Sequence, residues 1–478
     1  MKLKYILPIC AVVLSTSCNK FLEIRPKDKF IPESVEDYEN MLNSASLVNA
    51  GDYFQDLLTD DVFLPEGVPG NLLSNQQAHG RRIYTFNNVP YDGSANDFLW
   101  SEGYKRIFYF NTVINNIMTA SGNKGESYKK AVRAEALVGR AFEHLALVNV
   151  YAKHYDAATA ATEPGIPIAL IADISAKFVR NSVQETYDQI IKDLNDALPD
   201  LPAEPKITSF RASKPAAYAL LSRVYLYMGN WELARKNAED ALALKGDLFD
   251  MNNYAVIIPG PFPYVPGAPV GWTNIPATEK NPETIYARHF LRPMGLGQLT
   301  CASAELSALF TNDDQRWVLY YANGWPPAPP YNYWNLYQVK IFLRGDFYNN
   351  AAGIAELYLN AAEAKARLND MQGALDAVNE LRKHRLKPTA YADKAPADFG
   401  NDPEQVLRFV LEERRRELAF MNMRHIDLKR LNKEARFQKT ITHKAEGVEY
   451  KLLPNSKEYQ RQIWPAASAF NPDWPLNP

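Results

Sequence analysis

The stretch AAYALLSRVYLYMGNWELARKNAEDALAL, Ala216 to Leu244, decides the fold class of this chain. Its apolar and small residues recur at the spacing of a unit of about 34 residues built from two antiparallel helices. Counted from Tyr218, the aromatic that opens the pattern, the matching residues are Leu221, Ser222, Tyr225, Ala234, Ala238 and Ala241. The small residues among them let the two helices approach closely. The stretch therefore predicts a helical hairpin.

A second stretch, AELYLNAAEAKARLNDMQGALDAVNELRK, Ala355 to Lys383, repeats the pattern. Tyr358, Ala362 and Ala374 fall at the same offsets, although Lys365 replaces the second tyrosine. This is the pattern of tetratricopeptide repeats, which recur in tandem about every 34 residues. The two opening tyrosines are 140 residues apart here. We therefore expect a helical scaffold that is interrupted by a long insertion.

Further helices are predicted from their apolar faces and start signals. RAEALVGRAFEHLALVNVY, residues 133–151, is a third, looser candidate for a repeat. Ser182 and Glu185 form a capping box at the start of a helix that runs to Leu198. Asp402 followed by Pro403 starts another helix, and a third covers Tyr104 to Met118. The predicted fold is mostly α-helical, with few short strands.

The predicted insertion spans about residues 246–350 and is rich in proline, glycine and aromatic residues. Near its end, WPPAPPYNYWNLY, Trp325 to Tyr337, has four prolines and five aromatics, and proline excludes a regular helix or a central strand. Long loops are usually functional or disordered, but disordered segments are poor in aromatics. We therefore expect a ligand-binding insertion in a single domain, residues 18–478, whose helical scaffold covers about 18–245 and 351–478.

The N-terminus reads MKLKYILPICAVVLSTSCNK, and residues 1–17 have the charged, apolar and small-residue regions of a secretory signal. The small residues end at Cys18, as in a bacterial lipoprotein signal that is cleaved before an acylated cysteine. The alternative is a plain secretory signal with a coincidental cysteine. With Cys10 removed in the signal and Cys18 acylated, Cys301 is the remaining cysteine, which excludes an intrachain disulfide and a cysteine-based metal site.

Composition and motifs argue against several classes of function. The 478 residues are 46% apolar and 23% charged with a net charge of −2, so no nucleic-acid partner is indicated. No nucleophile elbow, phosphate loop, dinucleotide fingerprint or metal-binding motif occurs. Asp60-Asp61 and Asp313-Asp314 would suit a surface glycosidase, but acidic pairs are common. We interpret His144 as an interior residue, and we expect no catalytic residue, cofactor or metal site.

Short motifs over nearly the whole chain resemble the SusD/RagB-like outer-membrane lipoproteins of Bacteroidetes. They are FLEIRPKD after Cys18, the helix pattern Trp100, Tyr104, Ile107 and Asn111, residues 133–151, PGIPIA at 164–169, Asp314-x-Arg316, Lys340, AELYLNAAEAKARLND, ERRRELAFMNMRHIDLKR at 413–430 and QIWPAASAFNP. The motif at 413–430 departs from the family at Met421 and Asn422, where Glu-Gly is usual, and the C-terminal motif lacks the usual Pro-Ile-Pro. The chain looks like a divergent member.

The resemblance implies a tetratricopeptide-like scaffold with an irregular ligand-binding region, and a binding protein rather than an enzyme. Members are surface lipoproteins of the outer membrane that capture nutrients, most often glycans, and cap a SusC-like TonB-dependent transporter. We therefore expect an oligo- or polysaccharide ligand, such a transporter as partner, and a lipid anchor at Cys18 that leaves the protein facing the cell exterior. The alternatives are a peptide ligand, or a structural subunit that binds no ligand.

Aromatic side chains can stack on the C–H face of a sugar ring, while amides and arginines bond its hydroxyls. The residues expected to do so are Trp325, Tyr331, Asn332, Tyr333, Trp334, Asn335 and Tyr337, together with Trp272 and Tyr264 from the same insertion and Arg81, Tyr91 or Asp92 from an irregular N-terminal segment. The competing expectation is that these aromatics pack on one another and hold the long loop together.

Other motif residues are expected to belong to the scaffold. Trp100 is interpreted as a structural residue of its helix. A charge is seldom buried unpaired, so the charged motif residues are expected to form buried pairs with one another. These residues are Arg133, Glu135, Glu363, Arg424 and Asp427.

Overall fold

The structure is a computed structural model that describes residues 32–50, 53–64, 78–91, 95–205, 209–258, 272–273, 276, 278–291, 301–323, 340–342 and 347–477. These residues are mostly helical with short strands, which confirms the predicted fold class. The longer helices are α4 (Phe98–Asn116), α5 (Glu126–Tyr151), α6 (Val183–Ala197), α7 (Lys214–Met228), α8 (Trp231–Leu244), α12 (Ile354–Arg367), α13 (Met371–Lys383), α14 (Pro403–Leu418) and α15 (Arg424–Leu431).

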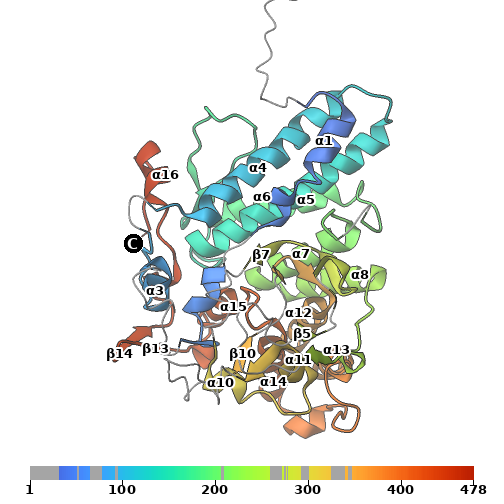
Figure 1. Cartoon of the computed structure of the whole chain (residues 1–478), viewed down its shortest axis with the longest axis vertical. Coiled ribbons are helices and arrows are strands. Elements are labelled where there is room, and N and C mark those ends of the chain that lie inside the picture. The colour runs from blue at the N-terminus through green and yellow to red at the C-terminus, as the bar shows by residue number, and fades with distance from the viewer. Residues whose placement is uncertain are drawn as a thin grey trace, which may run out of the picture.

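The long helices form one continuous array (Figure 1). Neighbours along the array contact each other in the order α4, α5, α6, α7, α8, α12, α13 and α14. Shorter helices cover its edges. They are α1 (Val35–Met41), α2 (Ala45–Val48), α3 (Ala78–Tyr84), α10 (Ala304–Ser307), α11 (Gln315–Tyr320) and α16 (Pro465–Phe470), with 3-10 turns such as η3 (Tyr53–Leu58) between them.

Helices α7 and α8 form the predicted hairpin. Gly229 ends α7 with φ of +74°, a left-handed conformation that glycine adopts without the steric cost of a Cβ. The Asn230 side chain then accepts a hydrogen bond from the Leu233 N–H and caps α8. The Ser222 hydroxyl of α7 donates to the Ala234 carbonyl of α8 at 2.9 Å. This bond shows the close helix approach that the small residues predicted.

The second predicted hairpin, α12 and α13, packs directly against the first. Helix α12 contacts α8, although 109 residues separate the end of α8 at Leu244 from the start of α12 at Ile354. The Asn360 amide of α12 donates to the Ser222 hydroxyl at 3.2 Å, and Lys365 pairs with Glu239 of α8 at 3.0 Å. The two units are therefore neighbours in space, as tandem repeats are, despite the interruption in sequence.

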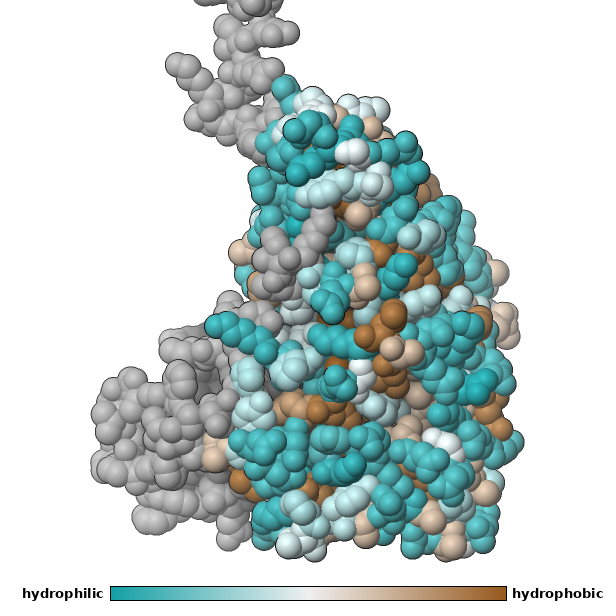
Figure 2. Space-filling view, turned by 90° about the vertical axis from the view of Figure 1, so that its right-hand side faces the viewer, coloured by the Kyte–Doolittle hydropathy of each residue, from teal (hydrophilic) through white to brown (hydrophobic). Residues whose placement is uncertain are grey.

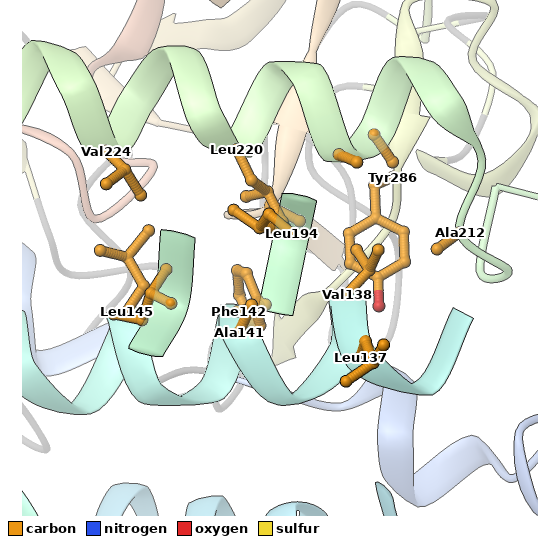
Figure 3. Packing of buried hydrophobic residues seen from close by; sticks show 14 of the residues in the cluster. Leu137, Val138, Ala141, Phe142, Leu145, Leu194, Ala212, Leu220, Val224 and Tyr286 are labelled. Atoms are coloured by element: carbon orange, nitrogen blue, oxygen red, sulfur yellow. The ribbon is translucent and has the colours of Figure 1, made fainter. Parts of the chain in front are cut away.

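The third candidate repeat is a single long helix rather than a hairpin. Residues 133–151 lie within α5, which packs against α4 and α6 on either side. Apolar residues of α5 face α7 across the core, with Leu145 opposite Val224 in Figure 3. At Gly139, a Cβ would lie 2.3 Å from the Phe110 ring of α4, so a larger residue would force the two helices apart.

The predicted helix starts agree with the structure. The Ser182 hydroxyl accepts from the Glu185 N–H at 3.1 Å, and the Glu185 carboxylate accepts from the Ser182 N–H at 2.8 Å, so the capping box of α6 is complete. Asp402 caps α14. The helix predicted from Tyr104 begins earlier, at Phe98, because Asp97 caps it.

Strands in the middle of the chain are short. A four-stranded antiparallel sheet has the order β1, β8, β10, β9 and joins the N-terminal part of the scaffold to the predicted insertion. Its strands are β1 (Val62–Phe63), β8 (Cys301–Ala302), β9 (Tyr321–Asn323) and β10 (Lys340–Phe342). The remaining strands form two-stranded pairs: β2 (Pro164–Pro167) with β3 (Arg180–Ser182), β4 (Val256–Ile258) with β5 (Trp272–Thr273), β6 (Thr284–Tyr286) with β12 (Ala352–Gly353), β7 (His289–Leu291) with β11 (Phe347–Asn349), and β13 (Ile441–Ala445) with β14 (Val448–Leu452).

Buried ion pairs fasten this middle region to the helical array. Arg385, which follows α13 and is fully buried, binds Glu283 at 2.8 Å and Glu417 of α14 at 3.1 Å. Glu417 also binds Arg316 of α11 at 3.0 Å, and Arg316 pairs with Glu413 at 2.7 Å. The Arg385–Glu283 and Arg316–Glu417 pairs join residues that are 102 and 101 positions apart in sequence.

Other charged motif residues are also paired. Glu135 pairs with Arg211, Arg424 with Asp60, and Arg430 bridges Glu363 and Asp427. Four of the motif residues are therefore held in ion pairs, as predicted, but all the partners lie outside the predicted set, so the expectation that these residues pair with one another is wrong. Arg133 is half-buried, and its pairing stays a prediction.

Candidate functional site

The proline- and aromatic-rich stretch is held at both ends by a β-ladder. Strands β9 and β10 pair antiparallel, with Asn323 opposite Lys340 and Tyr321 opposite Phe342. The segment between them, 324–339, therefore starts and ends at adjacent points on the sheet. Seven predicted ligand residues fall on this segment, outside the described residues. They are Trp325, Tyr331, Asn332, Tyr333, Trp334, Asn335 and Tyr337.

The same sheet brings part of the N-terminal segment near the base of this loop. Strand β1 pairs with β8, and β8 pairs with β10. Strand β1 follows η3, which contacts α3, the helix that carries Arg81. Arg81 is half-buried and pairs with Glu446, in the turn between β13 and β14, at 2.6 Å. This ion pair holds the guanidinium at the surface, with its side chain 34% exposed.

The other predicted residues are only partly described. Trp272 lies on β5, which pairs with β4, and nothing is described of its side chain. Tyr264 and Asp92 lie outside the described residues. Tyr91 is buried, with its ring 5.9 Å from that of His79 and beneath the Arg461 guanidinium at 5.8 Å. Tyr91 is therefore a packing residue, and the suggestion that it binds ligand is wrong.

An aromatic cluster that sequence reasoning missed lies where the loop begins. The rings of Phe310 and Trp317 stack at 5.0 Å, and Trp317 lies 4.9 Å from Tyr321, the first residue of β9. Tyr321 also contacts Phe420 after α14 at 6.1 Å. The cluster packs the start of β9 against the helical array. Trp317 and Tyr321 sit four residues apart, but no sequence signal placed Phe310 with them.

Motifs beside the loop serve the scaffold. The Asp314 carboxylate accepts from the Arg316 N–H and caps α11, and it also binds the Arg316 guanidinium at 2.7 Å. Arg316 is 1% exposed.

Trp100 of α4 is buried, and its ring lies 4.8 Å from that of Tyr151, which confirms its structural role.

The acidic pair Asp60-Asp61 is also part of the scaffold. Asp60 is buried and binds Arg424 at 2.8 Å and Lys439 at 2.6 Å, while Asp61 binds Arg415 at 2.6 Å. Burial raises the pKa of Asp60, but these cations outweigh it and hold that pKa well below the usual range. A glycosidase acid needs a raised pKa, so Asp60 is unsuited to that role. Burial does raise the pKa of Asp61, but its buried carboxylate is bound by Arg415 at 2.6 Å.

Histidines and metal-binding groups offer no catalytic arrangement among the described residues. His144 is fully buried, and burial lowers its pKa to about 3, so the ring is neutral. The expectation of an interior residue is confirmed, but neither ring nitrogen has a hydrogen-bond partner there. Within the same residues, no group of three or more His, Cys, Asp or Glu could hold a metal ion. None of the described helices is long and apolar enough to cross a membrane.

The face of the molecule shown in Figure 2 is largely hydrophilic among the described residues, with apolar patches in between. Two aromatic side chains of the described part are strongly exposed, Phe98 at 68% and Phe470 at 87%. Single exposed apolar residues are ordinary on a protein surface. Phe98 and Phe470 are therefore suitable control positions for replacing aromatic residues by alanine.

The fold matches solved structures over almost its whole length. A SusD superfamily protein from Bacteroides thetaiotaomicron is 19% identical with a TM-score of 0.72, covering 93% of this chain and 100% of that one. A putative sugar binding protein from Bacteroides vulgatus is 21% identical with a TM-score of 0.69, covering 94% and 99%. A SusD-like carbohydrate binding protein from Bacteroides vulgatus is 20% identical with a TM-score of 0.66, covering 92% and 97%. At these identities the likeness shows a shared fold.

Family models match the chain in two parts. Residues 20–226 match a SusD-like model described as "Starch-binding associating with outer membrane", and residues 353–473 match the model of the "SusD family". None of the curated proteins compared with the chain matches it. The models cover both halves of the scaffold and agree with the helical array described above. The chain therefore belongs to the SusD/RagB-like family.

Proposed function

We propose that this protein is a binding protein that captures an oligo- or polysaccharide at the outer membrane and passes it to a SusC-like TonB-dependent transporter. The family is described as starch-binding and associated with the outer membrane, and two structural neighbours are called sugar or carbohydrate binding proteins. Family members are binding proteins rather than enzymes. Asp60 and Asp61, buried in ion pairs, fit that description.

The observation that carries the proposal is the β9–β10 ladder at the base of segment 324–339. A ladder that closes both ends of a loop fixes where the loop leaves the protein. Five aromatics and two asparagines on such a loop are suited to sugar recognition, because rigid rings stack on C–H faces at little entropic cost and amides bond hydroxyls. Each contact is modest, so affinity for a polymer would come from several subsites.

The test is to replace Trp325, Tyr333 and Trp334 together by alanine and to measure retention in native gels that contain single polysaccharides. We expect the wild type to be retarded by at least one polysaccharide and the triple variant to migrate freely. The melting temperature should fall by no more than a few degrees, because these side chains are expected to face ligand rather than core.

A matched control replaces Phe98 and Phe470, two strongly exposed aromatics of the described scaffold, by alanine. This double variant should keep its retention, since it removes aromatic surface away from the loop. Retention that persists in the triple variant, or unfolding of that variant, would contradict the aromatic platform. The second outcome would favour the alternative in which the rings hold the loop together.

The ligand panel should include peptides as well as polysaccharides. Binding of peptides alone would identify a peptide-binding member of the family. No binding to either class, with co-purification of a transporter, would favour a structural subunit. Copurification from the outer membrane with a TonB-dependent transporter is the expected result in the proposed role.

A further inference from the structure

A small cavity lies inside the scaffold, between α5, α7 and the turn that joins α14 to α15. Its volume is about 60 Å³. Ala146, Asn350, Met421 and Ile426 line it and are half-buried, whereas its other lining residues are buried. The cavity therefore runs inward from the surface. The described residues that line it belong to η3, α4, α5, α7, the stretch at Asn350, the α14–α15 turn and α15, and none of them is on β9 or β10.

Several buried polar atoms at this cavity have no hydrogen-bond partner among the described residues. They are both amide atoms of Gln55, Oδ1 of Asn422, Oδ1 of Asn350 and Nδ1 of His425. Gln55 is 5% exposed, Asn422 7% and His425 1%. A buried polar group without a partner is costly, and unpartnered groups from three segments line one space: η3, the stretch at Asn350, and the turn that leads into α15. They indicate that a polar guest fills it.

The guest must be uncharged. Arg223, the one lining residue with a permanent charge, already binds Glu356 at 2.5 Å and the carbonyls of Asn350 and Ala351. Burial, together with nearby Lys429 and Arg461, holds the pKa of His425 well below its ordinary range, so its ring is neutral. A charged guest would find no opposite charge free to pair with it.

Part of the lining is apolar. It is formed by Leu99, Phe142, Leu145 and Val150, and Figure 3 shows Phe142 and Leu145 pointing from α5 toward α7. A buried water needs two to four polar partners, which these four side chains do not offer. The C–H groups of a guest would pack against these apolar side chains. Three of the unpartnered atoms, on Gln55, Asn350 and Asn422, are oxygens that can accept hydrogen bonds from its hydroxyls.

We propose that this cavity binds a small neutral polyol of two or three carbons, with its hydroxyls on Gln55, Asn422 and His425 and its carbon chain on Phe142 and Leu145. The size agrees: one buried water needs about 10–15 Å³ of such cavity volume, so about 60 Å³ has room for roughly four to six non-hydrogen atoms. Asn422 has φ of +60°, a left-handed conformation, and its N–H donates to Asp56 at 3.1 Å. The backbone of this turn therefore fixes the position from which the Asn422 side-chain amide extends.

The experiment is ligand-observed NMR on the mature protein with ethylene glycol, glycerol and, as a larger competitor, sorbitol. We expect saturation transfer to the two small polyols and none to sorbitol. Asn422→Gly should weaken the affinity about fivefold, the loss of one hydrogen bond, because glycine keeps the left-handed turn. Gln55→Leu should weaken it at least as much. The matched control is Gln372→Leu on the exposed face of α13, which should not change it.

Two results would overturn the proposal. One is no transfer to any polyol, together with a crystal structure that holds only ordered waters in the cavity. The other is equal transfer in the wild type and in Asn422→Gly, whose fold the substitution preserves. Neither result depends on whether the loop at 324–339 binds glycans.

Discussion

Arg385 is the residue whose removal should most clearly show how the middle region is held. Its guanidinium is fully buried. It donates to both oxygens of Glu283, to the carboxylate of Glu417 and to the Phe249 carbonyl at 3.1 Å. Arg385→Met keeps most of the volume of the side chain and removes its charge. The change leaves the buried carboxylate of Glu283 without its cation.

The expected cost follows from that loss. Breaking a buried ion pair by removing one partner costs about 3–5 kcal/mol, because the remaining charge stays buried and unpaired. Glu417 keeps Arg316 at 3.0 Å, so most of the penalty falls on Glu283, which retains the Phe249 N–H at 3.0 Å. We therefore expect the free energy of unfolding to fall by about 3–5 kcal/mol.

The assay is urea unfolding followed by both circular dichroism and tryptophan fluorescence, so that coincident curves justify a two-state free energy. The matched control is Arg436→Met, which breaks an exposed pair with Glu434 at 2.7 Å and should cost less than about 1 kcal/mol. Adding Glu283→Gln to Arg385→Met should recover at least about 1 kcal/mol, since the two residues are directly coupled.

The pH dependence gives a second readout. Burial already raises the pKa of Glu283 above 4.5 in the wild type, and loss of Arg385 should raise it further. A raised carboxyl pKa means that stability is present at low pH and is lost as pH rises through the folded-state value. The difference in free energy of unfolding between the wild type and Arg385→Met should therefore become smaller as the pH is lowered toward 4.5. A cost below about 1 kcal/mol at pH 7, equal to the control, would refute the reasoning.

Three further predictions concern other parts of the chain. Arg430 and Arg367 outweigh burial and lower the pKa of Glu363 from 4.5 to about 2, so the stabilisation by this carboxylate is present above pH 4.5 and is lost as pH falls toward 2. Between pH 5 and pH 3 the urea midpoint of Glu363→Gln should therefore depend less on pH than that of the wild type. An equal pH dependence in both proteins would contradict this ion-pair account. Ser182→Ala should cost about 1 kcal/mol by removing the cap of α6, with exposed Ser175→Ala as the neutral control; equal midpoints would argue against the cap. Cys18→Ala should move the protein from the membrane fraction to the soluble fraction, and continued membrane association would count against the lipid anchor.

Local sequence signals determined the helices well because helix caps and apolar faces act within a few residues. The capping box of α6 and the Asp402-Pro403 start of α14 are short-range devices. The length of α4 was underestimated because its start depends on Asp97. The span 133–151 was mistaken for a hairpin because its small residues serve contacts with other helices, as Gly139 does against Phe110.

The candidate site was less accessible to sequence reasoning. The sequence identified the aromatic stretch and the residues beside it, but not that Asn323 and Lys340 would face each other across a ladder. Nor did it place Phe310 against Trp317, or show that Tyr91 is buried. Strand pairing and ring stacking join residues far apart in the chain, and no local pattern records them. The binding roles of the loop residues, the domain bounds and the anchor at Cys18 stay predictions.

By itself the sequence determined that this is a mostly helical protein whose hairpins are separated by a long insertion, because helix periodicity and capping depend on residues that are close together in the chain. Only the tertiary structure decided that α8 and α12 are adjacent, that β1 joins the sheet at the base of the loop, and that Arg385 ties Glu283 to Glu417. The physical reason is that buried charges and strand edges must find partners wherever the folded chain provides them.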